Sequence, residues 1–182
     1  MNIWHGFPDE KITGERFYSV IEIPSGSKNK YELDKDTGLL KLDRVLYTST
    51  RYPANYGFIP RTLACDNDPL DVLVLCQEAI FPMTLVECFP IGVLKMTDGS
   101  DTDEKIIAIP FGDPTLSGYS DINELPKHRF EEIRHFFSVY KELEGRQTSV
   151  ENLYGRSEAV RIINECKDKY KAVFSDSSAA YV

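Results

Sequence analysis

Residues 66–75 read DNDPLDVLVL and join a dense group of carboxylates to an apolar run that is typical of a strand covered on both faces. Three aspartates fall within six residues, and the last of them, Asp71, immediately precedes Val72 at the edge of the expected core. An unpaired charge there is costly, so we expect Asp71 to have a partner. Pro69 restrains the local backbone, which suits a loop that must hold oxygen ligands in place. The alternative is a set of solvated surface acids without a ligand.

A calcium-binding EF-hand loop is the obvious competitor for this segment, and it fails at defined positions. With Asp66 as the first residue, the sixth position holds Asp71 instead of glycine, and the twelfth holds Gln77 instead of glutamate. The segment also leads into an expected strand, whereas an EF-hand loop leads into a helix. The sequence therefore predicts an acidic site of another kind.

A second acidic stretch, residues 98–105, reads DGSDTDEK and separates two further expected strands. Both acidic stretches lie at strand ends, so one mouth of a small barrel can hold them together. Oxygen ligands without imidazole or thiolate select hard cations, which indicates magnesium or manganese and not zinc. The three histidines, His5, His128 and His135, are scattered, and we expect them at surface or core positions.

Short strands separated by turn residues fill the first two thirds of the chain. Apolar residues at helical spacing in the last third predict one helix over residues 130–143 that stops at Gly145, and a second with Ser157 as its N-cap. We therefore predict an α+β, mainly β fold: a small five-stranded OB-like barrel with two flanking C-terminal helices. The expected strands cover residues 17–23, 30–34, 39–46, 72–75, 85–96 (bent at Pro90 and Gly92) and 104–110.

The chain has 182 residues without an internal repeat or flexible linker, and we expect a single domain over residues 1–182. Its formal charge of −8 (21 Lys and Arg against 29 Asp and Glu) argues against nucleic-acid binding, which depends on basic side chains that neutralise phosphates. No run is apolar and long enough to span a membrane, and the first ten residues lack the features of a secretion signal. The four cysteines have no zinc-site spacing, so we expect a cytoplasmic protein with reduced thiols.

Some charged residues occupy positions that strand alternation turns toward the core. Arg44 points the same way as Leu42, and Glu22 looks inward from strand 17–23. A guanidinium in such a position either pairs with a buried acid or binds an anionic ligand. Lys30 and Glu32 lie on the polar face of their strand, where periodicity alone predicts solvated side chains.

Tyrosines add hydroxyl donors. Residues 52–58 are expected to form a rigid turn that presents Tyr52 and Tyr56, whereas periodicity assigns Tyr140 to the core face of its helix. An oxygen-rich metal site ringed by lysine, arginine and tyrosine donors suits phosphoryl transfer, in which cations stabilise charge on phosphate oxygens. No P-loop or GxGxxG motif is present, so nucleotide binding through those motifs is not expected.

Together these residues resemble the pattern of the family I soluble inorganic pyrophosphatases, the magnesium-dependent, barrel-type enzymes, and in particular their prokaryotic type. The similarity covers roughly residues 17–175 and includes the signature at residues 66–72. Further segments in the family's order and spacing are residues 20–24, 30–32, 43–44, 52–57, 92–98, 103–105 and 135–141.

The resemblance implies hydrolysis of inorganic pyrophosphate to two orthophosphates by direct in-line attack of a metal-activated water. It also implies several Mg²⁺ ions per active site, with Mn²⁺ as a possible substitute, and assembly into a homohexamer. Asp68 would be the general base. The metal ions would be held by Asp66, Asp71, Asp98 and Asp103. The substrate would be bound by Lys30, Arg44, Tyr56, Tyr140, Lys141 and Lys105, and an outer shell would be formed by Glu22, Glu32 and Tyr52.

Two departures from the family pattern, Gly99 where many relatives have an acid and Tyr154 where several have tryptophan, leave the central positions intact. On the residues alone, two other classes of function stay open. A non-catalytic barrel could bind oligonucleotides or oligosaccharides, although acids at the expected mouth disfavour polyanions. A metal-dependent phosphatase for organic phosphates would use the same chemistry.

Overall fold

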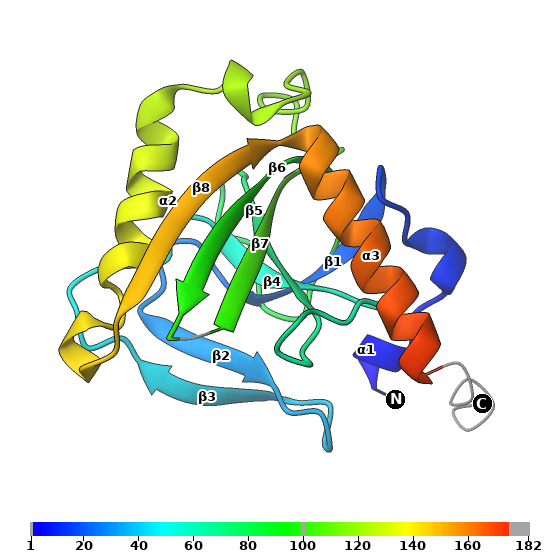
Figure 1. Ribbon diagram of the computed structural model, residues 1–182, viewed down its shortest axis with the longest axis horizontal. Helices are drawn as coiled ribbons and strands as arrows, with labels where there is room; N and C mark the ends of the chain where they lie inside the picture. Colours follow the sequence, from blue (N-terminus) through cyan, green and yellow to red (C-terminus); the bar gives the residue numbers. More distant parts are fainter. Residues whose placement is uncertain (1, 100, 175–182) are drawn as a thin grey trace.

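The computed structural model describes residues 2–99 and 101–174, which form eight strands, three α-helices and three short 3₁₀ turns (Figure 1). The strands are β1 (Phe17–Ile23), β2 (Asn29–Leu33), β3 (Leu40–Val45), β4 (Asn55–Ile59), β5 (Leu70–Val74), β6 (Leu85–Asp98), β7 (Asp101–Pro110) and β8 (Thr148–Gly155). The helices are α1 (Ile3–Gly6), α2 (Lys127–Val139) and α3 (Arg156–Phe174), and the 3₁₀ turns are η1 (Asp9–Lys11), η2 (Ile122–Glu124) and η3 (Glu142–Glu144).

Five of the strands close into a barrel. Neighbours in the main sheet follow the order β1-β4-β5-β7-β6-β8, and β6 also pairs with β1, which closes a ring of β1, β4, β5, β7 and β6. Strand β8 extends the sheet outside the ring, and β2 and β3 form a separate hairpin that runs along one end of the barrel (Figure 1). Helix α2 contacts β8, and α3 contacts β6. The predicted five-stranded barrel with two flanking C-terminal helices is confirmed.

Strand β6 serves three neighbours because it bends. Its first part pairs with β1 through residues 85–88, and its second part pairs with β8 through residues 92–98. The register against β7 shifts between Pro90 and Gly92. Proline cannot donate a ladder hydrogen bond, and an extra residue in one strand increases the local twist. The bend predicted from these two residues is therefore confirmed.

Alternation along β5 decides where its carboxylate points. Val72 and Val74 pack into the buried cluster that includes α3, whereas Leu73 packs with Leu75 into the cluster that includes α2. Successive side chains of a strand point to opposite faces. Asp71 therefore continues the row of Leu73 and Leu75 on the α2 side of the sheet.

Strand β7 repeats this pattern beside β5. Ile107 belongs to the α2 cluster and Ile106 to the α3 cluster, so Lys105 and Asp103 share the α2 side. The two strands are parallel, and their register places Asp71 opposite Lys105. Topology thus brings two segments that are more than thirty residues apart into one acidic cluster with a lysine at its centre.

The sequence predictions missed two strands. Residues 52–58 were expected as a rigid turn, which is wrong, because β4 begins at Asn55 and pairs with both β1 and β5. Pro53 and Gly57 look like turn residues. Gly57, however, allows β4 to lie close to β1, since a Cβ there would lie 1.9 Å from the carbonyl oxygen of Val20. Strand β8 was missed because it is an outer strand with only one buried residue, Val150.

The expected inward leucine face of residues 39–46 is only partly correct, since Leu42 is 51% exposed whereas Leu46 is 2% exposed and packs in the α2 cluster. Strand β3 lies in a two-stranded hairpin outside the barrel, so the core does not cover Leu42. The first C-terminal helix ends at Val139, and Leu143 lies in the exposed turn η3 beyond it. The second begins at Arg156, whose backbone N–H donates to Asp121 Oδ2 at 2.8 Å. A distant aspartate caps this N–H, and Ser157 lies inside the helix.

Within the described ranges, no helix combines the length and the apolar character that crossing a membrane requires. All four cysteines are free thiols, and two of them, Cys88 and Cys166, are buried. The expectation of unpaired thiols is consistent with this arrangement.

Replacing Gly57 by alanine should destabilise the barrel, because the added Cβ would collide with backbone atoms of β1 that cannot move independently. We expect Gly57→Ala to lower the free energy of unfolding by more than about 2 kcal/mol. Gly112→Ala is the control, since a Cβ at Gly112 meets no atom of the described residues within 4 Å. Urea unfolding measures both, and equal stability of the two variants would contradict the close β1–β4 contact.

Candidate active site

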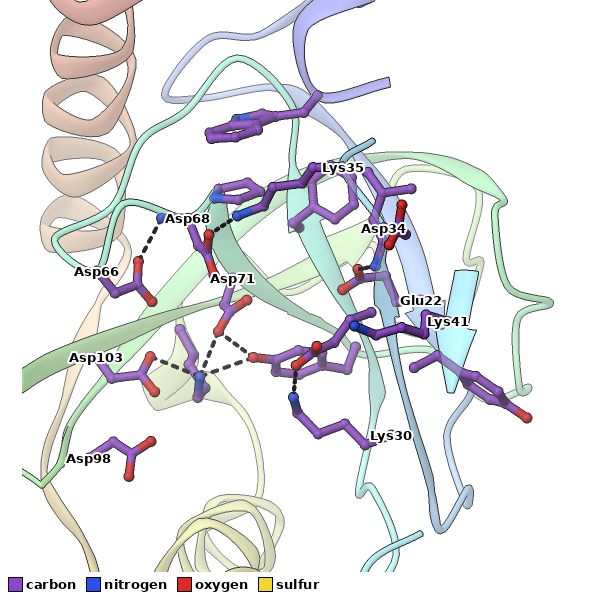
Figure 2. Close-up of a pocket in the computed structure, with 18 of the residues that line it drawn as sticks. Glu22, Lys30, Asp34, Lys35, Lys41, Asp66, Asp68, Asp71, Asp98 and Asp103 are labelled. Carbon is purple, nitrogen blue, oxygen red and sulfur yellow. Dashed lines mark hydrogen bonds and ion pairs between the residues drawn. The ribbon is translucent and has the colours of Figure 1, made fainter. Parts of the chain in front are cut away.

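A cavity of about 440 Å³ lies at the end of the barrel, where the two acidic stretches meet the β2–β3 hairpin (Figure 2). Twelve of the fourteen residues predicted for the site line this cavity. They are Glu22, Lys30, Glu32, Tyr56, Asp66, Asp68, Asp71, Asp98, Asp103, Lys105, Tyr140 and Lys141. The expectation that one barrel mouth holds both acidic stretches is confirmed.

Lys105 lies at the centre of the acidic cluster, and its side chain is only 3% exposed. Its Nζ donates to Asp71 Oδ2 at 2.7 Å, to Asp103 Oδ1 at 2.8 Å and to the hydroxyl oxygen of Tyr56 at 3.0 Å. The Tyr56 hydroxyl itself donates to Asp71. Burial disfavours the charged amine, but Asp71, Tyr56 and Asp103 together hold the pKa of Lys105 well above its ordinary value. The lysine therefore favours its charged form.

One buried ammonium does not balance the carboxylates around it. Burial raises the pKa of Asp71 above its ordinary value, and the charge of Asp103 raises it further, against the opposite effect of Lys105. A second positive charge would reduce the cost of burying these carboxylates, because a buried charge is tolerated only when it is fully compensated. The cluster is thus suited to receive a further cation.

The whole cavity repeats this imbalance. Eight carboxyl groups face five amino groups, so a negative excess remains even when Glu22, with its pKa raised to about 8, is protonated. The carboxyl groups belong to Glu22, Glu32, Asp34, Asp66, Asp68, Asp71, Asp98 and Asp103, and the amino groups to Lys30, Lys35, Lys41, Lys105 and Lys141. An anion can enter such a cavity only together with cations.

The chemistry of the donors fits a hard divalent cation. The cavity lining offers carboxylate oxygens and contains neither histidine nor cysteine. Across residues 2–99 and 101–174, no three acidic, histidine or cysteine side chains are already gathered as a coordination shell. In this conformation Asp71 and Asp103 each direct an oxygen to Lys105 instead.

Glu22 connects the hairpin to the barrel. Its carboxylate on β1 accepts the backbone N–H of Leu33 on β2 at 2.7 Å. Burial raises the pKa of Glu22 to about 8; the Leu33 hydrogen bond opposes this rise and the charge of Asp71 adds to it. The inward-looking side chain predicted at this position is confirmed, and its raised pKa favours the protonated form at neutral pH.

The amino groups at the cavity edge are held by acids. Lys30 pairs with Glu32 and with Asp43, and Lys141 pairs with Asp98. Both lysine side chains are largely buried. The solvated position that periodicity alone predicted for Lys30 is therefore wrong. Tyr140 is buried and stacks on Phe136 with ring centroids 5.2 Å apart, and it also borders the cavity. The core position and the cavity position predicted for Tyr140 are compatible.

Arg44 and Tyr52 lie beside the cavity and not in its lining. The Nε of Arg44 donates to Glu144 Oε1 at 2.9 Å, and its Nη1 donates to Asp43. Its Nη2 is buried and has no hydrogen-bond partner among the described residues. Such a donor is costly to leave unpaired, so an anionic ligand would satisfy it. Tyr52 is buried against Tyr56, with ring centroids 5.4 Å apart.

Six polar or aromatic residues of the lining were not predicted: Trp4, Tyr31, Asp34, Lys35, Lys41 and Phe58. Asp34 had a signal, because it continues the alternating face of Lys30 and Glu32. Lys35 and Lys41 flank the hairpin turn, where charged residues are ordinary, and local sequence gives no reason to single them out. Trp4 lies in a segment that carries no recognisable pattern.

A closed barrel whose mouth combines acids with buried cations is suited to reactions of phosphate compounds that need metal ions. The chain matches the family profile described as inorganic pyrophosphatase over residues 19–171. It is 46% identical over 168 residues to "Soluble inorganic pyrophosphatase 2" of Chlamydomonas reinhardtii, covering 92% of this chain and 88% of that protein. It is 48% identical over 153 residues to an inorganic pyrophosphatase of Halalkalibacterium halodurans, covering 84% and 94% respectively.

A solved structure agrees with this match. The inorganic pyrophosphatase from Thermus thermophilus superposes with a TM-score of 0.89 at 40% sequence identity, covering 94% of this chain and 99% of that one. The chain therefore belongs to the inorganic pyrophosphatase family, as the resemblance in its sequence implied.

The raised pKa of Glu22 has a consequence for the stability of the metal-free protein. The folded state binds the Glu22 proton more tightly than the unfolded chain, so this contribution to stability is complete below pH 4.5 and is lost as the pH rises toward about 8. We expect Glu22→Gln to reduce the loss of unfolding free energy over this range, by up to a few kcal/mol. Denaturant unfolding at a series of pH values, with a metal chelator present, measures the free energy of unfolding of each variant. Glu10→Gln, at an exposed position, is the control. Parallel pH profiles for wild type and Glu22→Gln would contradict the assignment.

Proposed function

We propose that this chain hydrolyses inorganic pyrophosphate to two orthophosphates by direct in-line attack of water, with Mg²⁺ as its cofactor. The observation that carries the proposal is Lys105, a buried ammonium shared by Asp71 and Asp103 inside a cavity with excess negative charge. A polyanionic substrate is repelled by such a cavity unless divalent cations accompany it. The family and this donor chemistry therefore point in the same direction.

The ions would be held by Asp66, Asp71, Asp98 and Asp103. Bound Mg²⁺ supplies positive charge to the phosphate oxygens and lowers the pKa of a coordinated water. Several ions per site fit the number of carboxylates, and Mn²⁺ satisfies the same oxygen donors.

Asp68 is the proposed general base. Its backbone is fixed, because its N–H donates to Asp66 Oδ1 at 3.0 Å and its carbonyl accepts the N–H of Ala64 at 2.8 Å. Its carboxylate is 56% exposed and borders the cavity, so it can reach a water there. Asp68 takes a proton as the water oxygen bonds to one phosphorus, and the bond from that phosphorus to the bridging oxygen breaks. No phosphoenzyme forms.

The cationic edge of the cavity would hold the two phosphates. We assign the phosphate under attack to Lys30 and Tyr56, and the leaving phosphate to Arg44, Tyr140 and Lys141. The unpaired Nη2 of Arg44 supports this assignment, because a phosphate oxygen would satisfy it. Lys105, at the centre of the cluster, would also bind the substrate, and an outer shell would be formed by Glu22, Glu32 and Tyr52.

The proposal includes two further points that rest on the resemblance and on composition. One is assembly into a homohexamer, which sedimentation equilibrium measures. The other is a cytoplasmic location.

A phosphate-release assay tests the proposed function. Wild-type protein with Mg²⁺ should hydrolyse pyrophosphate and leave nucleotide and sugar phosphates nearly untouched, and Ca²⁺ should replace Mg²⁺ poorly. Asp68→Asn should keep the unfolding midpoint and lose about 10²- to 10⁴-fold in kcat, because it removes the proton acceptor. Asp36→Asn, an exposed acid on the hairpin turn outside the lining, is the matched control.

Two results would overturn this account at different points. Absence of phosphate release from pyrophosphate removes the proposed function. A kcat of Asp68→Asn within about twofold of wild type removes Asp68 as the base and leaves the substrate in place.

A further inference from the structure

The N-terminal segment lies outside the part of the chain that matches the family profile, yet it reaches the cavity. Trp4 of helix α1 lines the cavity and is 5% exposed. Its ring packs in a buried cluster with Val20 and Phe58, and its Nε1 donates to the carbonyl oxygen of Thr62 at 2.8 Å. The family profile begins at residue 19. A residue outside it therefore forms part of the wall of the site.

Trp4 meets the cavity through Lys35. The Nζ of Lys35 lies 5.2 Å from the centroid of the Trp4 ring and forms an ion pair with Asp68. The side-chain amide of Asn2 donates to the backbone carbonyl of Lys35 at 3.0 Å. Figure 2 shows the Lys35 side chain extending from the hairpin to Asp68. The N-terminal segment thus holds Lys35 at its backbone and at its amino group.

Residues 62–64 form hydrogen bonds both to the Trp4 indole ring and to the loop that carries Asp68. Thr62 accepts the Trp4 indole N–H at its carbonyl, and its hydroxyl oxygen accepts the N–H of Leu70 at 2.9 Å. The N–H of Ala64 donates to the carbonyl of Asp68 at 2.8 Å. Residues 62–64 therefore fix the ring relative to the backbone of Asp68.

We propose that Lys35 is a positioning residue for Asp68, and that Trp4 and Asn2 hold Lys35 in place. The inference rests on the proposed role of Asp68 as general base. A carboxylate that is half exposed has several accessible rotamers, and one ammonium held by aromatic and backbone contacts restricts them. The ion pair is 45% exposed on the lysine side, so it contributes little to stability. The ion pair instead restricts the orientation of the Asp68 carboxylate.

Substitution of Lys35 tests this role without unfolding the protein. We expect Lys35→Gln to lower kcat about tenfold or more, because a misplaced catalytic group is costly, while KM for magnesium pyrophosphate stays within about twofold. Lys35→Arg keeps the charge and should restore most of the rate. Lys127→Gln, an equal change of charge at an exposed position on α2, is the control. An unchanged kcat for Lys35→Gln overturns the proposal, and so does a raised KM with unchanged kcat, which would make Lys35 a substrate ligand.

A double variant shows whether Lys35 acts through Asp68. In the Asp68→Asn background, Lys35→Gln should cause no further loss of the residual rate, because the partner carboxylate is already gone. A loss as large as in the wild-type background would overturn the proposal.

Fluorescence provides a test that does not need turnover. Trp4 is the only tryptophan of the chain, so the emission comes from a ring that has the Lys35 ammonium 5.2 Å from its centroid and His5 stacked on it. Asp68→Asn should shift the emission of the otherwise wild-type protein and leave that of Lys35→Gln unchanged. Equal shifts in both backgrounds would overturn the coupling. If the wild-type protein does not cleave pyrophosphate, the proposed function fails, whatever the fluorescence shows. If the wild-type protein cleaves pyrophosphate and Lys35→Gln has the same kcat, the inference about Lys35 fails and the proposed function stands.

Discussion

The buried ion cluster around Lys105 is the constraint on which the site depends. A single ammonium, nearly inaccessible to solvent, donates hydrogen bonds to Asp71, to Asp103 and to the hydroxyl oxygen of Tyr56. Removing either kind of charge would leave the other buried and uncompensated. The cluster therefore keeps a negative excess that protein groups alone do not balance. Divalent cations are the natural complement, and they are also what a polyanionic substrate needs.

The barrel produces this cluster through alternation and register. The parallel pairing of β5 with β7 places Asp71 beside Lys105, and the face that they share continues into the leucine and isoleucine side chains packed under α2. The apolar row anchors both strands, so the charged residues at its end have little freedom to separate. Hydrophobic packing on one side of the sheet thus fixes electrostatics at its edge. The β2–β3 hairpin then covers the open side and contributes lysines, with Glu22 linking it to β1.

Much of this arrangement could be predicted from sequence, for identifiable reasons. Asp66, Asp68 and Asp71 were recognisable because carboxylates directly ahead of a doubly buried strand are rare without a ligand. Strand β4 was not recognisable, since its proline and glycine look like a turn until the closely approaching neighbour strand is known. The leucine face of β3 failed for a related reason, because alternation cannot show that a strand lies outside the barrel. Lys35 was missed because it matters only through a contact with Asp68, 33 residues away.

Calorimetric titration of the substrate-free protein with Mg²⁺ tests the central claim most directly. The claim predicts saturable binding that raises the thermal unfolding midpoint, since an ion that binds only the folded state stabilises it by mass action. It further predicts that Asp71→Asn weakens this binding while the protein stays folded. A folded wild-type protein that shows neither saturable Mg²⁺ binding nor a change in its midpoint would contradict the account.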